Sequence, residues 1–165
     1  METYNLIMET LRNSTLTEEL RDAEIEQLAT LITVRDYKAG EYILQPGEAD
    51  LKCSLLILAS GDVEANANTG GEKMTLHMLT QGDLAGIIGF VGGNVMQISA
   101  TTVAKSDSKV LVLERVRFES LLNTQPAIVY YVMRGLARYI HGIVRRMNTQ
   151  SVEMSNYIHK TGGRY

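Results

Sequence analysis

Apolar residues recur at helical spacing in the first thirty positions of the chain. The residues of this first apolar face are Tyr4, Ile7, Met8 and Leu11. A second helix is predicted to begin with Asp22 as its N-cap and to continue through AEIEQLATLI, whose early glutamates suit the helix dipole. The pattern therefore predicts a helical N-terminal part over residues 1–33.

Between residues 34 and 114 the apolar period changes to that of strands. Short apolar runs alternate with turns rich in Gly, Asn and Asp, such as PGEAD at 46–50 and ANTGGE at 67–72. In KMTLHML at 73–79, alternate residues are predicted to be buried: Met74, Leu76 and Met78. Turns at this regular spacing predict an antiparallel sandwich or barrel, with ANTGGE as a hairpin tip.

The last part of the chain is predicted to be helical again, over residues 115–154. RVRFESLLN forms a short helix, and Pro126, suited to a first helical turn, opens a long one that ends near Met154. A helix of about 29 residues measures about 43 Å, so part of it is expected to pack against something beyond the body. Residues 155–165 are predicted to be a flexible tail.

Two glycines lie inside the predicted long helix, Gly135 and Gly142, on one face. A glycine inside a helix costs about 1 kcal/mol relative to alanine, which favours a close helix–helix approach between two identical chains. The predicted dimer interface consists of Tyr131, Gly135, Tyr139 and Gly142. Packing of both glycines against the chain's own barrel is the alternative.

Composition places the chain among soluble globular domains. The 165 residues are 45% hydrophobic and 21% charged, with a single cysteine, Cys53, which excludes a disulfide framework. The N-terminus has no basic region ahead of an apolar run, and the compact apolar stretch at 54–60 is far shorter than the roughly 20 residues of a membrane helix. A cytoplasmic protein without a membrane segment is expected.

The charges are distributed unevenly along the chain. Residues 1–114 hold 8 Lys/Arg and 17 Asp/Glu, whereas residues 115–165 hold 8 and 2. Six of these basic side chains lie on the long helix and the tail: Arg134, Arg138, Arg145, Arg146, Lys160 and Arg164. They are expected to pair with acidic surfaces of a partner chain rather than with nucleic acid, because the body itself is acidic.

The order of these elements resembles the cyclic nucleotide-binding domain of the catabolite-activator type of bacterial regulators. The resemblance runs from LRNSTL near residue 11 through AGEYI, PGEAD, LLILASGDVEA, QGDLAG and SATTVA to the end of the long helix near residue 150. It implies a mainly β fold, a jelly-roll or double-stranded β-helix barrel with N-terminal helices and a long C-terminal helix. The barrel is assigned to residues 34–114.

The family's phosphate-binding cassette is similar to F-G-E-(L/I)-(A/G), a short loop, and R-(S/A)-A. The resemblance implies that backbone N–H groups and the arginine hold the cyclic phosphate, while the glutamate accepts the ribose hydroxyl. The corresponding stretch here is LAGIIGFVGGNVMQISATTVA. Gly86, Ser99 and Ala100 fit the pattern, but Ile87 stands at the glutamate and Ile98 at the arginine.

Loss of one partner of a buried charge pair costs about 2–5 kcal/mol, so cyclic nucleotide binding in the usual mode is not expected. Compensation by an arginine of the long helix (Arg134, Arg138 or Arg145) stays open. The pocket is either collapsed and kept as scaffold, or apolar and built for another ligand. The candidate ligand-binding residues of this degenerate pocket are Gly86, Ile87, Ile98, Ser99, Ala100 and, from the long helix, Ile143.

No enzymatic motif stands out. The chain has no G-x-S-x-G elbow and no P-loop, and its three histidines, His77, His141 and His159, form no local cluster with metal-ligand spacing. Haem ligation by His77 or Cys53 is a minor alternative. After Met147 only 18 residues remain, too few for the DNA-reading module that follows the long helix in the family's regulators.

The sequence therefore predicts a non-enzymatic regulatory module without a cofactor or metal. It is expected to form a homodimer through the C-terminal helix, with a small-molecule ligand or an acidic protein as a further candidate partner. The alternatives are a protein-interaction scaffold with a collapsed pocket and a divergent binder of cyclic AMP or cyclic GMP.

Overall fold

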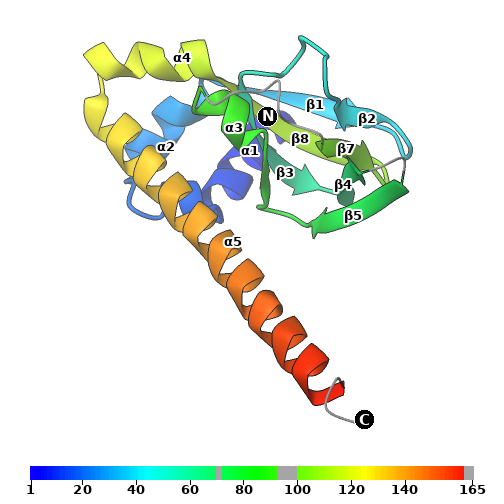
Figure 1. The fold of residues 1–165 in the computed structure, drawn as a ribbon. Helices are drawn as coiled ribbons and strands as arrows, with labels where there is room; N and C mark the ends of the chain where they lie inside the picture. Colours follow the sequence, from blue (N-terminus) through cyan, green and yellow to red (C-terminus); the bar gives the residue numbers. More distant parts are fainter. Residues whose placement is uncertain (70–71, 93–99, 162–165) are drawn as a thin grey trace.

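Two antiparallel sheets form the body of the protein, and helices cover one side of it (Figure 1). The computed structural model describes residues 1–69, 72–92 and 100–161. The strands are β1 (Ile32–Tyr37), β2 (Tyr42–Leu44), β3 (Ser54–Ser60), β4 (Val63–Thr69), β5 (Glu72–Leu79), β6 (Leu84–Ala85), β7 (Ala100–Ala104) and β8 (Ser108–Glu114). In the described part they form two four-stranded sheets, of order β1-β8-β3-β6 and β2-β7-β4-β5. The predicted jelly-roll barrel with flanking helices is confirmed.

The helices precede and follow the barrel. They are α1 (Glu2–Arg12), η1 (Thr15–Thr17), α2 (Asp22–Ala29), α3 (Ile87–Phe90), α4 (Arg115–Glu119), η3 (Ser120–Asn123) and α5 (Pro126–Thr161). The long helix begins at Pro126 as predicted, but the predicted end near Met154 is wrong. It has 36 residues, about 54 Å, because neither glycine nor proline interrupts the chain between Gly142 and residue 162.

The start of α2 differs by one residue from the prediction. Arg21 is the N-cap and Asp22 is the first helical residue. The Glu24 carboxylate accepts a hydrogen bond from the Arg21 backbone N–H at 2.8 Å and another from the Arg21 guanidinium at 2.9 Å. These hydrogen bonds favour the ionised carboxylate and lower the pKa of Glu24.

Strands β3 and β8 are buried on both faces, which explains the continuous apolar run at 54–60. On one face Leu55, Ile57 and Leu111 join the first core, which they share with the N-terminal helices and the first half of α5. On the other face Leu56 and Val110 join a second core inside the barrel. A strand enclosed on both sides has no polar face, so its sequence does not alternate.

Strands β4 and β5 form the predicted hairpin, with pairs from Val63↔Leu79 to Thr69↔Glu72. The prediction that Met78 is buried is wrong, because its side chain is 43% exposed while Leu79 is 4% exposed. Leu79 faces the second core opposite Val63, which turns Met78 to the outside. The side chains of Met74 and Leu76 lie outside the described residues.

Candidate functional site

The cassette begins at Gly86, which links β6 to α3. Gly86 has φ +75°, in the left-handed region that favours glycine. A Cβ atom added here would lie 2.4 Å from the carbonyl oxygen of Ser54 and 3.7 Å from the Leu44 side chain. Both the backbone conformation and the close approach of β3 therefore require glycine.

Replacing Gly86 with alanine is expected to destabilise the fold by about 3 kcal/mol, from about 1–2 kcal/mol of left-handed backbone strain and about 1–3 kcal/mol of overpacking. The measurement is the free energy of unfolding in urea. Gly82→Ala is the matched control, because Gly82 has φ +88° and no atom within 4 Å of an added Cβ. Equal losses in the two variants would contradict a steric role for Ser54.

Ile87 is the first residue of α3, and its partly buried side chain packs against the first core. The helix is further held by Phe90, whose ring centroid lies 5.4 Å from that of Phe118. Ile87, which the resemblance aligns with the family's glutamate, thus extends the apolar contacts of α3.

The other end of the cassette is described only from Ala100 onward. Ala100 is the first residue of β7 and pairs with Ala67 of β4. Ile98 and Ser99 lie outside the described residues. Their predicted roles stay predictions.

An arginine that the sequence pattern did not single out contacts the C-terminal end of α3. Arg115 lies with its Nη1 3.5 Å from the Gly89 carbonyl oxygen and its Nη2 3.8 Å from Cys53 Sγ. Arg115 directly follows β8, and nothing in the local sequence indicates that this position meets the cassette.

The barrel interior is filled by the chain's own side chains. Among the residues that the structure describes, the cavity in this interior measures about 10 Å³, room for about one water molecule, whereas small-molecule pockets measure about 300–1,000 Å³. Its lining residues are Ile43, Leu56, Leu58, Val63, Leu79, Asp83, Ala85, Thr102 and Val110. Of the two polar ones, Thr102 already accepts a hydrogen bond from the Leu44 backbone N–H at 3.0 Å.

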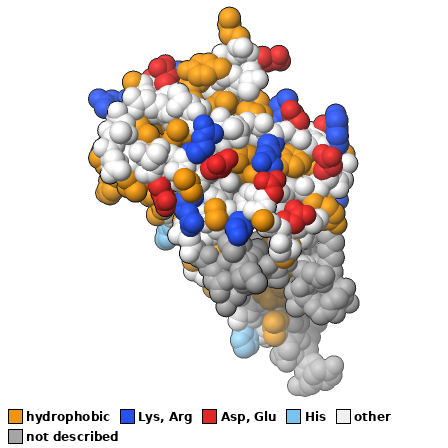
Figure 2. All heavy atoms as spheres, turned by 90° about the horizontal axis from the view of Figure 1, so that it is seen from above, with side chains coloured by type: hydrophobic (Ala, Val, Ile, Leu, Met, Phe, Trp, Pro, Cys, Tyr) orange, Lys and Arg blue, Asp and Glu red, His pale blue; other side chains and the backbone are white. Residues whose placement is uncertain are grey.

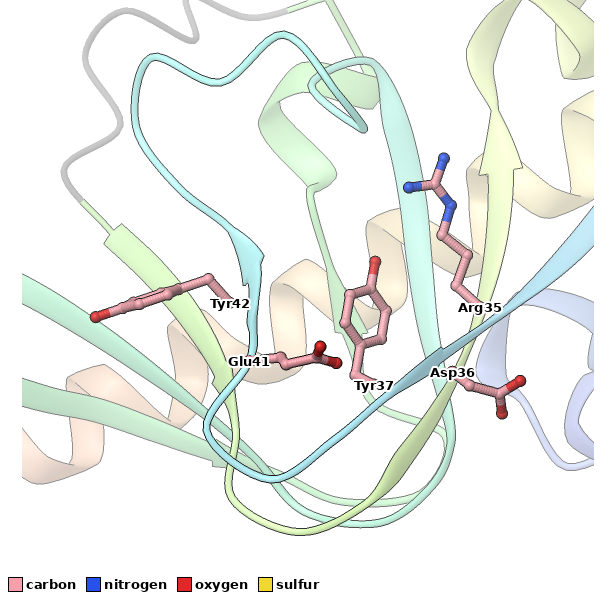
Figure 3. A pocket seen from close by; sticks show the side chains of 5 residues that line it. All are labelled: Arg35, Asp36, Tyr37, Glu41 and Tyr42. Atoms are coloured by element: carbon pink, nitrogen blue, oxygen red, sulfur yellow. The ribbon is translucent and has the colours of Figure 1, made fainter.

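A larger cleft, of about 650 Å³, lies on the surface between β1 and β2 (Figure 3). Its lining residues are Arg35, Asp36, Tyr37, Glu41 and Tyr42. Arg35 forms a two-point ion pair with Asp50, at 2.6 and 3.2 Å, which lowers the pKa of that carboxyl. Asp36 pairs with Lys109, and Glu41 accepts a hydrogen bond from the Lys38 backbone N–H. The charged groups of this cleft are therefore engaged within the chain, and none is a predicted site residue.

Charge and metal-binding groups are dispersed over the described surface. Figure 2 shows basic and acidic side chains interspersed with apolar ones on the face seen from above. Among the described residues, no three His, Cys, Asp or Glu side chains are grouped closely enough to hold a metal ion. His77 Nε2 lies 3.7 Å from Asp83, and Cys53 is a free thiol. No helix in the described ranges has the length and hydropathy needed to cross a bilayer.

Gly135 packs against the chain's own N-terminal part. A Cβ added to Gly135 would lie 2.6 Å from the Thr15 carbonyl oxygen and 2.8 Å from the Leu16 Cα. Gly142 has no atom within 4 Å of such a Cβ. The predicted contact of Gly135 with a second chain is therefore wrong, and the alternative of packing within the chain holds for this glycine, with η1 rather than the barrel as its neighbour.

Two basic residues of α5 form ion pairs within the chain. Arg134 Nε lies 3.2 Å from Glu19, and Arg138 forms ion pairs with Glu18, at 3.5 Å, and with Glu19. Both arginines thus have carboxylate neighbours within the chain. The expectations that they face an acidic partner or compensate for the cassette arginine stay predictions. Their carboxylate partners follow η1, and Glu19 lies 119 residues before Arg138 in the chain.

The predicted aromatic interface residues also face inward. Tyr131 and Tyr139 are partly buried against the first core. The Tyr139 hydroxyl accepts a hydrogen bond from the Leu84 backbone N–H at 3.1 Å, and burial raises the pKa of Tyr139. Ile143, the predicted ligand contact of the helix, is half-buried one turn beyond Tyr139.

A different face of α5 carries six exposed apolar side chains. They recur at alternating spacings of three and four residues: Met133, Ile140, Val144, Met147, Met154 and Ile158, with the small residues Ala137 and Ser151 completing the series. We call this set the α5 stripe. Val144 is 45%, Met147 60% and Met154 63% exposed. The spacing is that of a coiled-coil seam, and this signal, rather than the glycine pair, identifies the exposed apolar face.

The barrel, the cassette position between β6 and β7, and the long helix together define a cyclic nucleotide-sensor type of domain. A model of the cyclic nucleotide-binding domain family matches residues 34–125. The match covers more than half of the chain, so the chain belongs to this family.

Two curated relatives are similar over most of this chain. The cyclic AMP receptor protein of Thermus thermophilus is 29% identical over 129 residues, which are 78% of this chain and 58% of the relative. Human cGMP-dependent protein kinase 2 is 26% identical over 141 residues, 84% of this chain and 17% of the kinase. The chain thus spans less than two thirds of either relative.

Solved structures share the fold. A cyclic nucleotide-binding domain from Methylobacillus flagellatus superposes with a TM-score of 0.79 at 19% identity, covering 93% of this chain and 84% of that one. The Thermus thermophilus catabolite activator protein superposes with a TM-score of 0.66 at 28% identity, covering 84% of this chain and 63% of that one. A third structure is the regulatory subunit of a cAMP-independent protein kinase A from Trypanosoma cruzi, bound to guanosine. It superposes with a TM-score of 0.63 at 24% identity, covering 98% of this chain and 52% of that one.

Proposed function

We propose that this member of the family is a non-enzymatic regulatory module that does not bind cyclic nucleotide in the usual mode. The filled barrel interior carries the proposal, since its cavity of about 10 Å³ is far smaller than a ligand pocket. Ile87 adds support, because it packs into the first core where the family pattern places a carboxylate. The interior favours the collapsed pocket over an open apolar one.

Electrostatics supports the same proposal. An ionised phosphate in a protein interior needs a counter-charge and hydrogen-bond donors. Arg134 and Arg138 are held by Glu18 and Glu19. Arg115 contacts the C-terminal end of α3, opposite the end where the cassette begins. Each of these three guanidinium groups thus contacts a group of the same chain, which makes it less available to a bound phosphate.

Titration calorimetry with cyclic AMP and cyclic GMP tests the proposal. No saturable heat is expected for either nucleotide up to about 1 mM, which corresponds to a binding free energy weaker than about −4 kcal/mol. Guanosine serves as an uncharged comparison, because it lacks the phosphate that requires a counter-charge. Saturation by either cyclic nucleotide in the micromolar range would replace this proposal with that of a divergent cyclic nucleotide binder. Saturation by guanosine alone would favour an apolar pocket that opens on binding.

The second part of the proposal concerns the partner. We propose that two copies of the chain pair through the α5 stripe. Figure 1 shows the C-terminal part of α5 extending away from the barrel, and the stripe continues along that part to Ile158, which is 58% exposed. Isolated helices in water are marginal, and most helix stability comes from packing an apolar face. A second α5 offers a matching apolar face of the same length.

A reducing, cytoplasmic setting is part of the proposal and agrees with the free thiol of Cys53. An acidic protein partner has less support than a second copy, because Arg134 and Arg138 already have carboxylate partners. A scaffold role, in which the barrel orients α5 and takes no ligand, is the second candidate. The filled barrel interior favours this scaffold role over a role in ligand sensing.

A further inference from the structure

Two edge strands border the surface cleft between β1 and β2. β1 is the first strand of the order β1-β8-β3-β6, and β2 is the first of the order β2-β7-β4-β5. Each pairs with a single strand, and in the described part of the chain no strand lies on the other side of either. The cleft of about 650 Å³ therefore lies between the open edges of the two sheets (Figure 3).

The edge of β1 carries backbone groups without a strand partner. All six residues of β1 are in register with β8, and in an antiparallel pair every second residue points its N–H and C=O groups away from the partner strand. Among the described residues, the backbone of residues 33–37 forms no hydrogen bond to a segment other than β8. Such an edge can take up a further strand, and addition of an extended peptide to a sheet edge is a general mode of peptide recognition.

Two of the charged groups that line the cleft are neutralised within the chain. Arg35 forms its two-point ion pair with Asp50. Asp36 lies 2.5 Å from the ammonium group of Lys109. Neither pair adds a net charge to the cleft.

Glu41 is the exception among the charged lining residues. One of its carboxylate oxygens, Oε2, accepts a hydrogen bond at 2.6 Å from the backbone N–H of Lys38, which is a neutral donor. The ammonium group of Lys38 lies 2.7 Å from Asp107, and within the described ranges no cationic side chain forms an ion pair with Glu41. Glu41 is exposed, so its negative charge and its other oxygen, Oε1, face a ligand from solvent.

Aromatic rings flank this carboxylate. Figure 3 shows the Tyr37 ring between Glu41 and Arg35. Tyr37 is partly buried against the second core, which restricts its ring, whereas Tyr42 at the rim is 56% exposed. A Lys or Arg side chain is stabilised by a carboxylate and by the face of a tyrosine ring. The lining therefore favours a cationic side chain on an extended backbone over an anion.

We propose that the cleft between β1 and β2 binds an extended basic segment of a protein partner. The segment adds as a strand to the edge of β1 and directs a Lys or Arg side chain to Glu41 and Tyr37. Tyr42 supplies apolar contact at the rim. The site uses neither the cassette nor the α5 stripe, so it does not depend on the proposed dimer.

NMR titration of the full chain, labelled with ¹⁵N and deuterium, tests this proposal. The probe is an acetylated and amidated eight-residue peptide of alternating Thr and Arg. A second peptide with Glu in place of Arg reverses the charge, and a third with methylated backbone nitrogens on every second residue prevents strand pairing. N-acetylarginine amide supplies the cation without a strand.

The Thr–Arg peptide is expected to bind with a dissociation constant below about 1 mM and to shift the amide signals of residues 33–37 and 41–42. The acidic and the N-methylated peptides are expected to bind at least about tenfold more weakly, because one loses the charge complementarity and the other the main-chain hydrogen bonds. N-acetylarginine amide is expected to show no saturation up to about 10 mM.

Variants of the chain test the named contacts. Glu41→Gln removes the charge but keeps an oxygen that accepts from the Lys38 N–H, and it is expected to weaken the Thr–Arg peptide about threefold. Tyr42→Ala is expected to weaken it about twofold. Glu48→Gln is the matched control, because Glu48 is exposed in the next loop and does not line the cleft. It is expected to bind the peptide as the wild type does.

Four results would overturn the proposal or one of its parts. Absence of saturation by the Thr–Arg peptide below about 1 mM, or equal binding of the acidic peptide, overturns the basic partner. Equal binding of the N-methylated peptide overturns strand addition to β1. Shifts confined to α5 move the basic segment to another surface, and an equal effect of Glu48→Gln and Glu41→Gln overturns the role of Glu41.

Discussion

Val144→Glu and Met147→Glu are each expected to convert the dimer into monomers. Both side chains lie on the α5 stripe and are 45% and 60% exposed in the single chain, so neither contributes much to its fold. In a dimer each substitution places two carboxylates in an apolar seam, where an unpaired charge costs about 3–5 kcal/mol. The dimer dissociation constant should rise at least about 100-fold. Sedimentation velocity over a range of concentrations measures it.

The matched control for these variants is Thr149→Glu. Thr149 is exposed on the same helix, close in sequence to Met147 and off the α5 stripe, with its hydroxyl bonded to the Arg145 carbonyl. The Thr149→Glu substitution adds the same charge outside the proposed seam. The dimer dissociation constant should stay within about threefold of the wild-type value, since surface substitutions change free energies by less than about 0.5 kcal/mol. Dissociation of Thr149→Glu, or persistence of the dimer in Val144→Glu, would place the interface elsewhere.

Gly135→Ala and Gly142→Ala are expected to change stability in opposite directions. A Cβ added at Gly135 would meet the backbone of Thr15 and Leu16 at 2.6–2.9 Å, and backbone atoms cannot move aside as a flexible side chain does. Overpacking of this kind costs about 1–3 kcal/mol, more than the gain of about 1 kcal/mol from helix propensity. At Gly142 there is no atom within 4 Å of the added Cβ, so only the propensity gain remains.

The measurement is the free energy of unfolding in urea, at one protein concentration for the wild type and both variants so that dimerisation affects them equally. A net loss of up to about 2 kcal/mol is expected for Gly135→Ala and a gain of about 1 kcal/mol for Gly142→Ala. A stabilised Gly135→Ala would show that α5 can withdraw from η1 without cost. Weaker dimerisation of Gly142→Ala would show that Gly142 belongs to the dimer interface.

The barrel and its helices could be predicted from the sequence because their signals are local. Turn residues at regular spacing separate the strands, and Pro126 opens the long helix where it was expected. The apolar run at 54–60 predicts a buried strand but not its place between two cores. A strand that is buried on both faces lacks the alternation of apolar and polar residues that would show which face points to a core. The alternation at 73–79 predicts Met78 on the buried face, and this is wrong because the hairpin register, which no local pattern specifies, sets Leu79 opposite Val63.

The candidate site was harder to predict, because its state depends on contacts between distant segments. The substitutions Ile87 and Ile98 are visible in the sequence as departures from the family pattern. Whether the barrel interior is open depends on how side chains from β3, β5 and β8 fill it, and the cavity lined by described residues measures about 10 Å³. Likewise, the Tyr139 hydroxyl accepts a hydrogen bond from Leu84 of β6, 55 residues away in the chain. The spacing of residues along a helix does not indicate such a contact.

The family and the order of elements can be read from the amino-acid chain alone, since they follow from periodicity, turn chemistry and residue identity. The loss of the charged cassette residues is predicted from the same chain. Which face of α5 is exposed depends instead on the folded arrangement. Gly135, Tyr131 and Tyr139 face inward because η1, the first core and β6 occupy that side of the helix. Helical periodicity defines faces but does not say which one the rest of the chain covers, because that depends on packing between segments far apart in sequence.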